Sequence, residues 1–134
     1  MDWKLIFQLS MFGLAMGIAT VFVIPSSIEP IFWLVIFVIC AVIIAKRRVG
    51  KPFLHGLLVS LVNSVWITIA HVLLFDTYIA NHAREAAMML GSPVPPRLMM
   101  LLTGPIIGLL SGLVLGLFAV VASKVVKPAA TPQV

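Results

Sequence analysis

Five polar side chains recur on one face of the segment 53–75, which is otherwise strongly apolar. They are Ser60, Asn63, Ser64, Thr68 and His71. At about 100° per residue in a helix, these side chains fall within an arc of roughly 140°, with Trp66 on the opposite side. An amide in the middle of a hydrophobic helix is costly when it faces hydrocarbon. The stripe therefore predicts interhelical hydrogen bonds or, as an alternative, a polar pathway for a substrate or protons.

A histidine and a carboxylate, His82 and Glu85, follow at i,i+3 spacing and would share one helix face. Such a pair is a candidate for metal binding, although two ligands alone do not make a site. If the preceding helix continued without a break, His71 and His82 would lie about 16 Å apart along its axis and could not share an ion. Only a fold-back near Asp76 would bring the two histidines together. We therefore expect no metal and no cofactor.

The composition predicts the solvent in which this chain folds. Of its 134 residues, 62% are hydrophobic and 10% are charged, whereas soluble domains average about 45–50% apolar and about 25% charged residues. This composition predicts an integral membrane protein and excludes a large multidomain enzyme. The sequence contains no phosphate-binding loop, no CxxC pair and no Ser/His/Asp set, so we assign no catalytic residues. The single cysteine, Cys40, lies within a hydrophobic segment and excludes an intrachain disulfide.

Four hydrophobic segments are the candidates for membrane spans, since about 20 helical residues cross about 30 Å of hydrocarbon. They are residues 5–24, 31–45, 53–75 and 98–123, of which the second is short. They predict an all-α fold, a bundle of four transmembrane helices that forms a single domain over residues 1–126. The polar, proline-containing tail at 127–134 is expected to be disordered.

The placement of Lys and Arg predicts the orientation of these spans. Seven cations flank the spans on one side, and only Arg84 and Arg97 lie on the other. The seven are Lys4, Lys46, Arg47, Arg48, Lys51, Lys124 and Lys127. Because basic loops stay in the cytoplasm, both termini are expected there. The net charge of +5 therefore indicates a lipid bilayer as the partner, and no nucleic acid.

The loop between the third and fourth spans carries helix signals. Residues 77–90 contain neither Gly nor Pro and begin after the acidic Asp76. This pattern predicts a short extracytoplasmic helix that either lies on the membrane or extends the third span. The prolines of residues 91–96 predict an extended segment after it.

Glycines form two stripes of small residues. In the fourth span they recur at every fourth position, and the first span has a shorter version. The positions are Gly104, Gly108, Gly112 and Gly116 in one segment and Gly13 and Gly17 in the other. Small residues let helix backbones approach closely in lipid. We expect the first and fourth spans to pack on each other through these stripes, with homo-oligomerisation as the alternative and a glycine-lined pore as a third possibility.

Three features of the sequence point to a family. A loop with Met and Glu precedes the fourth span, and the Gly-rich last span ends in Lys. A basic connector leads into the third span, with the sequence Ala45-Lys46-Arg47-Arg48-Val49-Gly50-Lys51-Pro52-Phe53. In these features, residues 40–128 resemble an uncharacterised family of bacterial four-helix membrane proteins. The resemblance implies a four-helix fold and a bacterial inner membrane, and it implies no catalytic residues.

Three hypotheses about function follow from the sequence. The first is a structural or accessory membrane protein that packs with itself or within a larger complex. The second is a small transporter or channel that uses the polar stripe, and the third is a metal-dependent membrane enzyme at the outer face. A water-accessible cavity that reaches Asn63 would favour the second hypothesis over the first, and a metal bound at His82 and Glu85 would favour the third.

Overall fold

The structure is a computed structural model that describes residues 1–127. Within this range it consists of six helices and no strands. The helices are α1 (Trp3–Phe22), α2 (Glu29–Lys46), α3 (Pro52–Leu73), α4 (Phe75–Asn81), α5 (Ala83–Leu90) and α6 (Pro96–Val125). The four longest helices, α1, α2, α3 and α6, are long and apolar enough to cross a membrane. The tail predicted at 127–134 lies, apart from Lys127, outside the described residues.

Proline defines where three of the long helices begin. Pro30, Pro52 and Pro96 each lie in the first turn of their helix, where a missing backbone N–H costs nothing because that N–H has no partner within the helix. For this reason α2 has 18 residues and is longer than the predicted span 31–45, which began after Pro30. Pro105 lies inside α6, and the helix continues through it.

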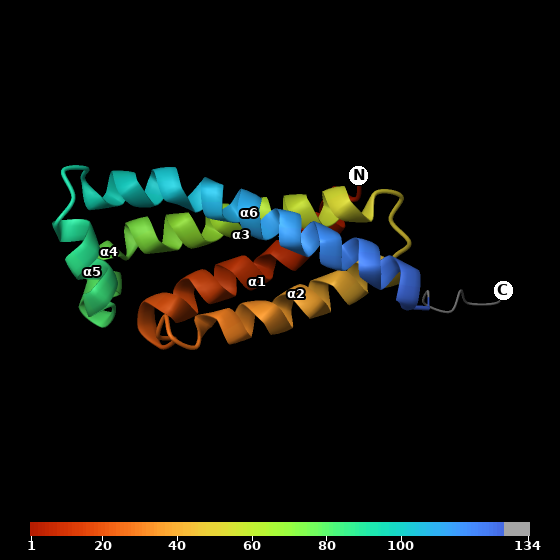
Figure 1. Cartoon of the computed structure of the whole chain (residues 1–134), viewed down its shortest axis with the longest axis horizontal. Helices are drawn as coiled ribbons and strands as arrows, with labels where there is room; N and C mark the ends of the chain where they lie inside the picture. The colour runs from red at the N-terminus through yellow and green to blue at the C-terminus, as the bar shows by residue number, and fades with distance from the viewer. Residues whose placement is uncertain (128–134) are drawn as a thin grey trace.

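The two ends of the bundle differ in charge (Figure 1). The N-terminus, the end of α6 and the connector between α2 and α3 lie at one end, which we call the basic end because Lys4, Lys46, Lys51 and Lys124 lie at or near it. The connector between α1 and α2, together with α4 and α5, lies at the opposite end, which we call the capped end.

Helix α3 lies between α1 and α6 and makes the most extensive contacts of the bundle with them. Its pairing with α1 is parallel, since Gly13 meets Asn63 and Gly17 meets Ala70. Its pairing with α6 is antiparallel. The expected packing of the first span on the fourth is therefore wrong. Both glycine stripes face α3, whose own small and polar residues let a backbone approach from either side.

Glycine is required where α3 and α6 come closest. A Cβ added at Gly56 would lie 2.7 Å from the carbonyl oxygen of Leu115 and 2.8 Å from the Cα of Gly116, which are backbone atoms. Toward the capped end, the same interface places Gly104 against Thr68 and Gly108 against Ser64. The α6 stripe is thus occupied within the chain along the whole length of α3.

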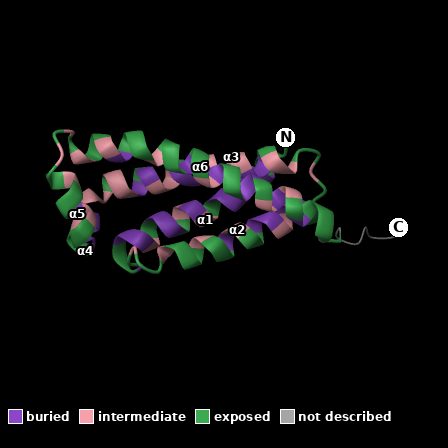
Figure 2. Cartoon of the chain, viewed as in Figure 1, coloured by how far each residue is buried: buried purple, intermediate pink, exposed green. Residues whose placement is uncertain are grey.

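Hydrophobic side chains from all four long helices close the bundle at the basic end. Buried residues of this core include Leu5 and Ile6 of α1, Cys40 and Ile44 of α2, Val59 of α3, and Leu115 and Ala119 of α6. Elsewhere the outward faces are exposed (Figure 2). They carry large hydrophobic side chains such as Ile106 and Leu110 of α6, which are 58% and 60% exposed. A continuous apolar exterior of this kind suits hydrocarbon better than water.

The segment after α3 folds back as two short helices, so the prediction of one helix over 77–90 is wrong. The backbone of Leu74 (φ −103°, ψ 30°) ends α3, and that of His82 (φ −132°, ψ 68°) separates α4 from α5. Asn81 then donates through Nδ2 to the carbonyl oxygen of Val21 at 2.8 Å. This bond satisfies a carbonyl in the last turn of α1 and holds α4 over the bundle.

Candidate ligand cavity

A cavity of about 680 Å³ opens in the half of the bundle next to the capped end. Its walls are the polar face of α3, the adjoining face of α6 and the first three turns of α2, and α4 and α5 contribute to its roof. Leu34 and Ile107 line the cavity and are also exposed on the outside of the bundle. The cavity therefore opens sideways, between α2 and α6. The volume lies within the roughly 300–1,000 Å³ typical of small-molecule sites.

All five residues of the predicted polar stripe line this cavity, namely Ser60, Asn63, Ser64, Thr68 and His71. The stripe therefore has two neighbours. Ser60, Asn63 and His71 bond to neighbouring helices, as expected for interhelical hydrogen bonds, and the same face of α3 borders the cavity. The alternative of a polar pathway for a substrate or protons stays a prediction.

Asn63 is the deepest amide of the stripe and is only 2% exposed. Its Oδ1 accepts a hydrogen bond from the backbone N–H of Gly13 at 3.0 Å. Its Nδ2 has no partner among the described residues. A buried donor without a partner costs about 1–3 kcal/mol. Asn63 lines the cavity, but its Nδ2 is fully buried, so an acceptor in the cavity would reach this nitrogen only if the amide turned toward the open space.

The hydroxyl groups of the stripe direct their hydrogens toward backbone carbonyls. Ser60 donates to Gly108 at 3.1 Å and Ser64 donates to Leu61 at 2.7 Å. Each hydroxyl hydrogen is used in this way, so the serine oxygens offer lone pairs to the cavity. Ser60 and Ser64 therefore act as acceptors toward the cavity.

His71 connects the stripe to α1 through Thr20. The Thr20 hydroxyl lies 2.7 Å from the Met16 carbonyl oxygen and donates to it, while His71 Nε2 lies 2.8 Å from the same hydroxyl oxygen. Thr20 has one hydroxyl hydrogen, so the assignment that satisfies both contacts makes His71 the donor through Nε2. Nδ1 then carries a lone pair, which adds a further acceptor to the polar wall.

Aromatic side chains form the opposite wall. Trp33 packs edge-on against Phe37 with ring centroids 6.1 Å apart, and Phe37 packs against Phe118 of α6 at 6.3 Å. At the end of this wall nearest the capped end, the Trp33 indole N–H donates to Glu29 Oε1 at 3.1 Å. The carboxylate of Glu29 is thereby held beside the aromatic wall, where it lines the cavity.

Three stacked rings form part of the roof. Tyr78 of α4 stacks on His71 of α3 with centroids 4.4 Å apart, and on its other face it stacks on His82 at 4.1 Å. This is the fold-back that could bring the two histidines together, but the phenol ring lies between them. The histidines therefore share an aromatic neighbour instead of an ion.

The second predicted site pair, His82 and Glu85, lies at the edge of this roof, where Glu85 lines the cavity. His82 is 5% exposed, its Nδ1 lies 2.9 Å from the Tyr78 carbonyl oxygen, and its Nε2 has no partner among the described residues. Within residues 1–127 the structure brings together no group of three or more His, Cys, Asp and Glu side chains that could hold a metal. The pair thus gains no third protein ligand there.

Negative charge gathers around Tyr78, which lies outside the four long helices. A hydrogen bond from the Ser26 side chain lowers the pKa of Glu85 and favours the carboxylate. Burial, and after it the nearby negative charges of Glu85 and Glu29, raise the pKa of the Tyr78 phenol to about 12. Two carboxylates thus face the roof of the cavity from α2 and α5.

The titration of Tyr78 provides a test of this arrangement. It is the only tyrosine of the chain, so the ultraviolet absorbance of tyrosinate reports it alone. We expect a midpoint near pH 12, and Glu85→Gln should lower the midpoint because it removes a repelling charge. The pKa of Tyr78 is higher in the folded chain than in the unfolded chain. Its contribution to the free energy of unfolding should therefore be fully present below pH 10 and lost as the pH rises from about 10 to about 12. An unshifted midpoint near 10 would show that Tyr78 is not in the roof.

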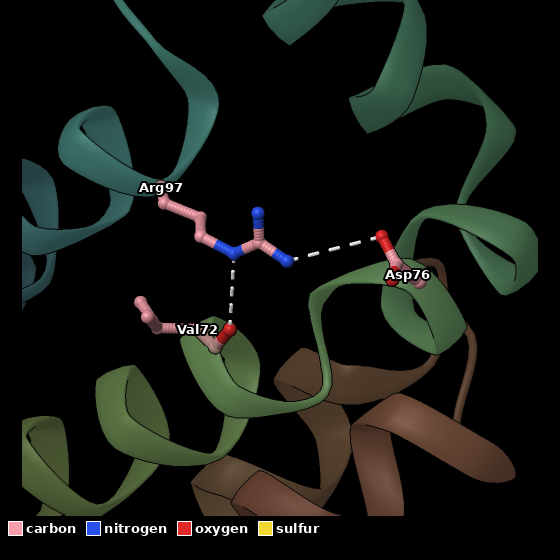
Figure 3. A network of polar contacts seen from close by, with 3 residues as sticks. All are labelled: Val72, Asp76 and Arg97. Atoms are coloured by element: carbon pink, nitrogen blue, oxygen red, sulfur yellow. Dashed lines mark hydrogen bonds and ion pairs between the residues drawn. The ribbon is translucent and has the colours of Figure 1, made fainter.

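A separate contact group fastens α6 to the end of α3 outside the cavity (Figure 3). Arg97 donates through Nε to the Val72 carbonyl oxygen at 3.5 Å, and its Nη2 lies 3.9 Å from Asp76 Oδ1. The guanidinium also lies 4.7 Å from the centre of the Phe75 ring. Arg97 is thereby directed at the α3–α4 elbow, and it does not line the cavity.

A comparison of the chain with protein-family models, with curated proteins and with solved structures finds no match. The resemblance to a bacterial four-helix family thus stays a prediction.

The residues that form the aromatic wall and the roof were not predicted as site residues from the sequence. Glu29, Trp33 and Tyr78 are separated in sequence, and each has an ordinary structural explanation taken alone. One signal was present, since Glu29 and Trp33 are spaced i,i+4, which places a carboxylate and an indole on one helix face. Gly56 was also overlooked, because it stands alone in α3 and belongs to no glycine stripe of its own helix.

Proposed function

We propose that this chain is an integral membrane protein with both termini in the cytoplasm, and that its cavity binds an amphipathic small molecule from the extracytoplasmic side. The observation that carries the proposal is the cavity of about 680 Å³ lined by the polar stripe of α3. The cavity is open near the capped end and closed by a hydrophobic core at the basic end. Access in the half near the capped end and closure at the basic end support an outward-facing state of a small transporter.

The membrane orientation rests on charge and on the two ends of the bundle. The four apolar helices supply the spans, and the basic connector between α2 and α3 favours the cytoplasm for the basic end. The capped end then lies outside, where α4 and α5 form a short extracytoplasmic structure. Assignment to a bacterial inner membrane rests on the family resemblance of residues 40–128.

The alternative function, a structural subunit packed through glycine stripes, has weaker support. Its interface would need the stripes of α1 and α6 to be free, yet both are covered by α3 of the same chain. The faces of α6 that stay exposed carry large aliphatic side chains such as Leu113 and Leu117. The same argument weighs against homo-oligomerisation through the glycines. We propose no catalytic activity.

The orientation predicts a reporter pattern. Fusions truncated at Gly50 and at the end of α6 should give a cytoplasmic signal, and a fusion at Ser92, after α5, should give an extracytoplasmic one. Ser92 is the informative position because it lies between the last two spans. A cytoplasmic signal at Ser92 would contradict the four-span topology.

Water access to the cavity tests the function. With Cys40 replaced by Ala, Thr68→Cys should react with a membrane-impermeant thiol reagent added from outside, because the thiolate that reacts needs water to form. The matched control is Ile69→Cys, one residue along α3 but on its exposed apolar face. We expect labelling at Thr68→Cys at least about tenfold faster than at the control. Equal, slow labelling at both positions would reject an outward-open cavity.

A further inference from the structure

The chemistry of the cavity lining selects the charge of its occupant, if the cavity binds a small molecule as proposed above. Among the described residues, those lining the cavity include two carboxylates, Glu29 and Glu85, and no Lys or Arg. The charge of Arg84 acts on Glu85 from outside the cavity, whereas the half-buried Glu29 has no ion-pair partner among the described residues. An unpaired charge that is partly buried is unfavourable, so an occupant of positive charge would be stabilised beside Glu29.

The hydrogen-bonding groups of the walls point to the same charge. Ser60 and Ser64 give their hydrogens to backbone carbonyls and turn lone pairs toward the space, and the Glu29 carboxylate is already oriented by the Trp33 indole. An acceptor-rich wall repels anions and attracts cationic or donor groups.

The aromatic wall provides a place for the body of the occupant. Trp33 and Phe37 line the cavity together with Glu29, and aromatic rings attract cations. A positive centre near Glu29 would meet both a carboxylate and an aromatic ring, with apolar surface along α2 for the rest of the molecule. The sideways opening between α2 and α6 would admit such an amphipathic molecule from the outer leaflet.

From these contacts we infer that the cavity binds a hydrophobic organic cation, with its positive centre near Glu29 and its apolar body against the aromatic wall of α2. Asn63 lies deeper and is only 2% exposed. Its unpartnered Nδ2 would donate to the molecule, or to a water that the molecule retains, once the amide turns toward the cavity.

Two ions of matched shape and opposite charge provide the test. The purified full chain in nanodiscs of zwitterionic lipid is titrated with tetraphenylphosphonium and, separately, with tetraphenylborate, and uptake by empty nanodiscs is subtracted. We expect saturable binding of one phosphonium per chain and no saturable binding of the borate. Saturable binding of the borate as tight as that of the phosphonium would overturn the inference.

Carboxylate variants locate the charge effect. Glu29→Gln keeps an oxygen for the Trp33 indole while removing the charge, and it should weaken phosphonium binding by about fivefold or more. Asp76→Asn is the control, since Asp76 lies at the same end of the bundle but its side chain is 95% exposed and does not line the cavity. Equal affinities for Glu29→Gln and Asp76→Asn would also overturn the inference.

Binding of neither ion would also overturn the inference. The labelling rate of Thr68→Cys then decides whether the proposed function is rejected together with the inferred occupant. Fast labelling would leave the outward-open cavity standing with an occupant of another chemistry. Slow labelling, equal to that of Ile69→Cys, would reject the cavity and with it the proposed function.

Discussion

Alanine at Gly13 is expected to lower the free energy of unfolding by about 1–3 kcal/mol, although alanine is the better helix former. A Cβ there would lie 2.6 Å from the Cα of Asn63 and 2.8 Å from its Cβ. A Cα atom moves only with its helix, so α1 and α3 must separate. Gly56→Ala should have a similar cost, because its Cβ would meet the backbone of Leu115 and Gly116.

The other glycines provide a graded series for this measurement. Gly17→Ala should cost less than Gly13→Ala, since its closest contacts are 3.1 Å to Ala70 Cβ and Ile67 Cα. Gly50→Ala and Gly91→Ala are the controls, with no contact within 4 Å at Gly50 and ordinary contacts from 3.6 Å at Gly91. Unfolding in detergent, followed by circular dichroism, gives the order. Equal stability of Gly13→Ala and Gly50→Ala would show that α1 and α3 do not pack as described.

Tryptophan at Ser111 should fill the cavity and block it. Ser111 lines the part of the cavity nearer the basic end and does not belong to the glycine stripe. It lies three residues after Gly108, whose carbonyl accepts a hydrogen bond from Ser60. In the Cys40→Ala background, labelling of Ser60→Cys should become at least about tenfold slower when Ser111→Trp is added. The free energy of unfolding of Ser111→Trp should be unchanged or higher, because the added side chain fills empty space and displaces no packed residue.

The matched control for the blocked cavity is Leu110→Trp. Leu110 precedes Ser111 on α6 but is 60% exposed on the outside of the bundle. It adds the same large side chain without entering the cavity, so labelling of Ser60→Cys should keep its rate. If both tryptophans slow the labelling equally, the reagent reaches Ser60 by some route other than the cavity.

Much of the long-helix framework could be predicted from sequence because it depends on local properties. Length and hydropathy locate four spans in the described chain to within a few residues, and the arc of Ser60, Asn63 and Thr68 follows from helix geometry alone. The packing partners could not be predicted in this way. A glycine stripe shows that a backbone approaches closely, but not which one, and here α3 takes both stripes.

The roof of the cavity was beyond sequence reasoning for a different reason. Residues 77–90 have good helix formers throughout, and nothing local requires a break at His82. The break is stabilised by tertiary contacts, namely the stack of Tyr78 between His71 and His82 and the bond from Asn81 to Val21. Such contacts override the propensity of a short helix, which is weak in isolation.

The central claim, that a small molecule occupies the cavity, is tested most directly by the mass of the intact protein. The chain is extracted from its own membranes into nanodiscs and released in a native mass spectrometer. We expect one small-molecule adduct per chain, retained in Leu110→Trp and lost in Ser111→Trp. Identical spectra for the two variants, with or without adducts, would contradict the account, because they would show that what binds this chain does not bind in the cavity.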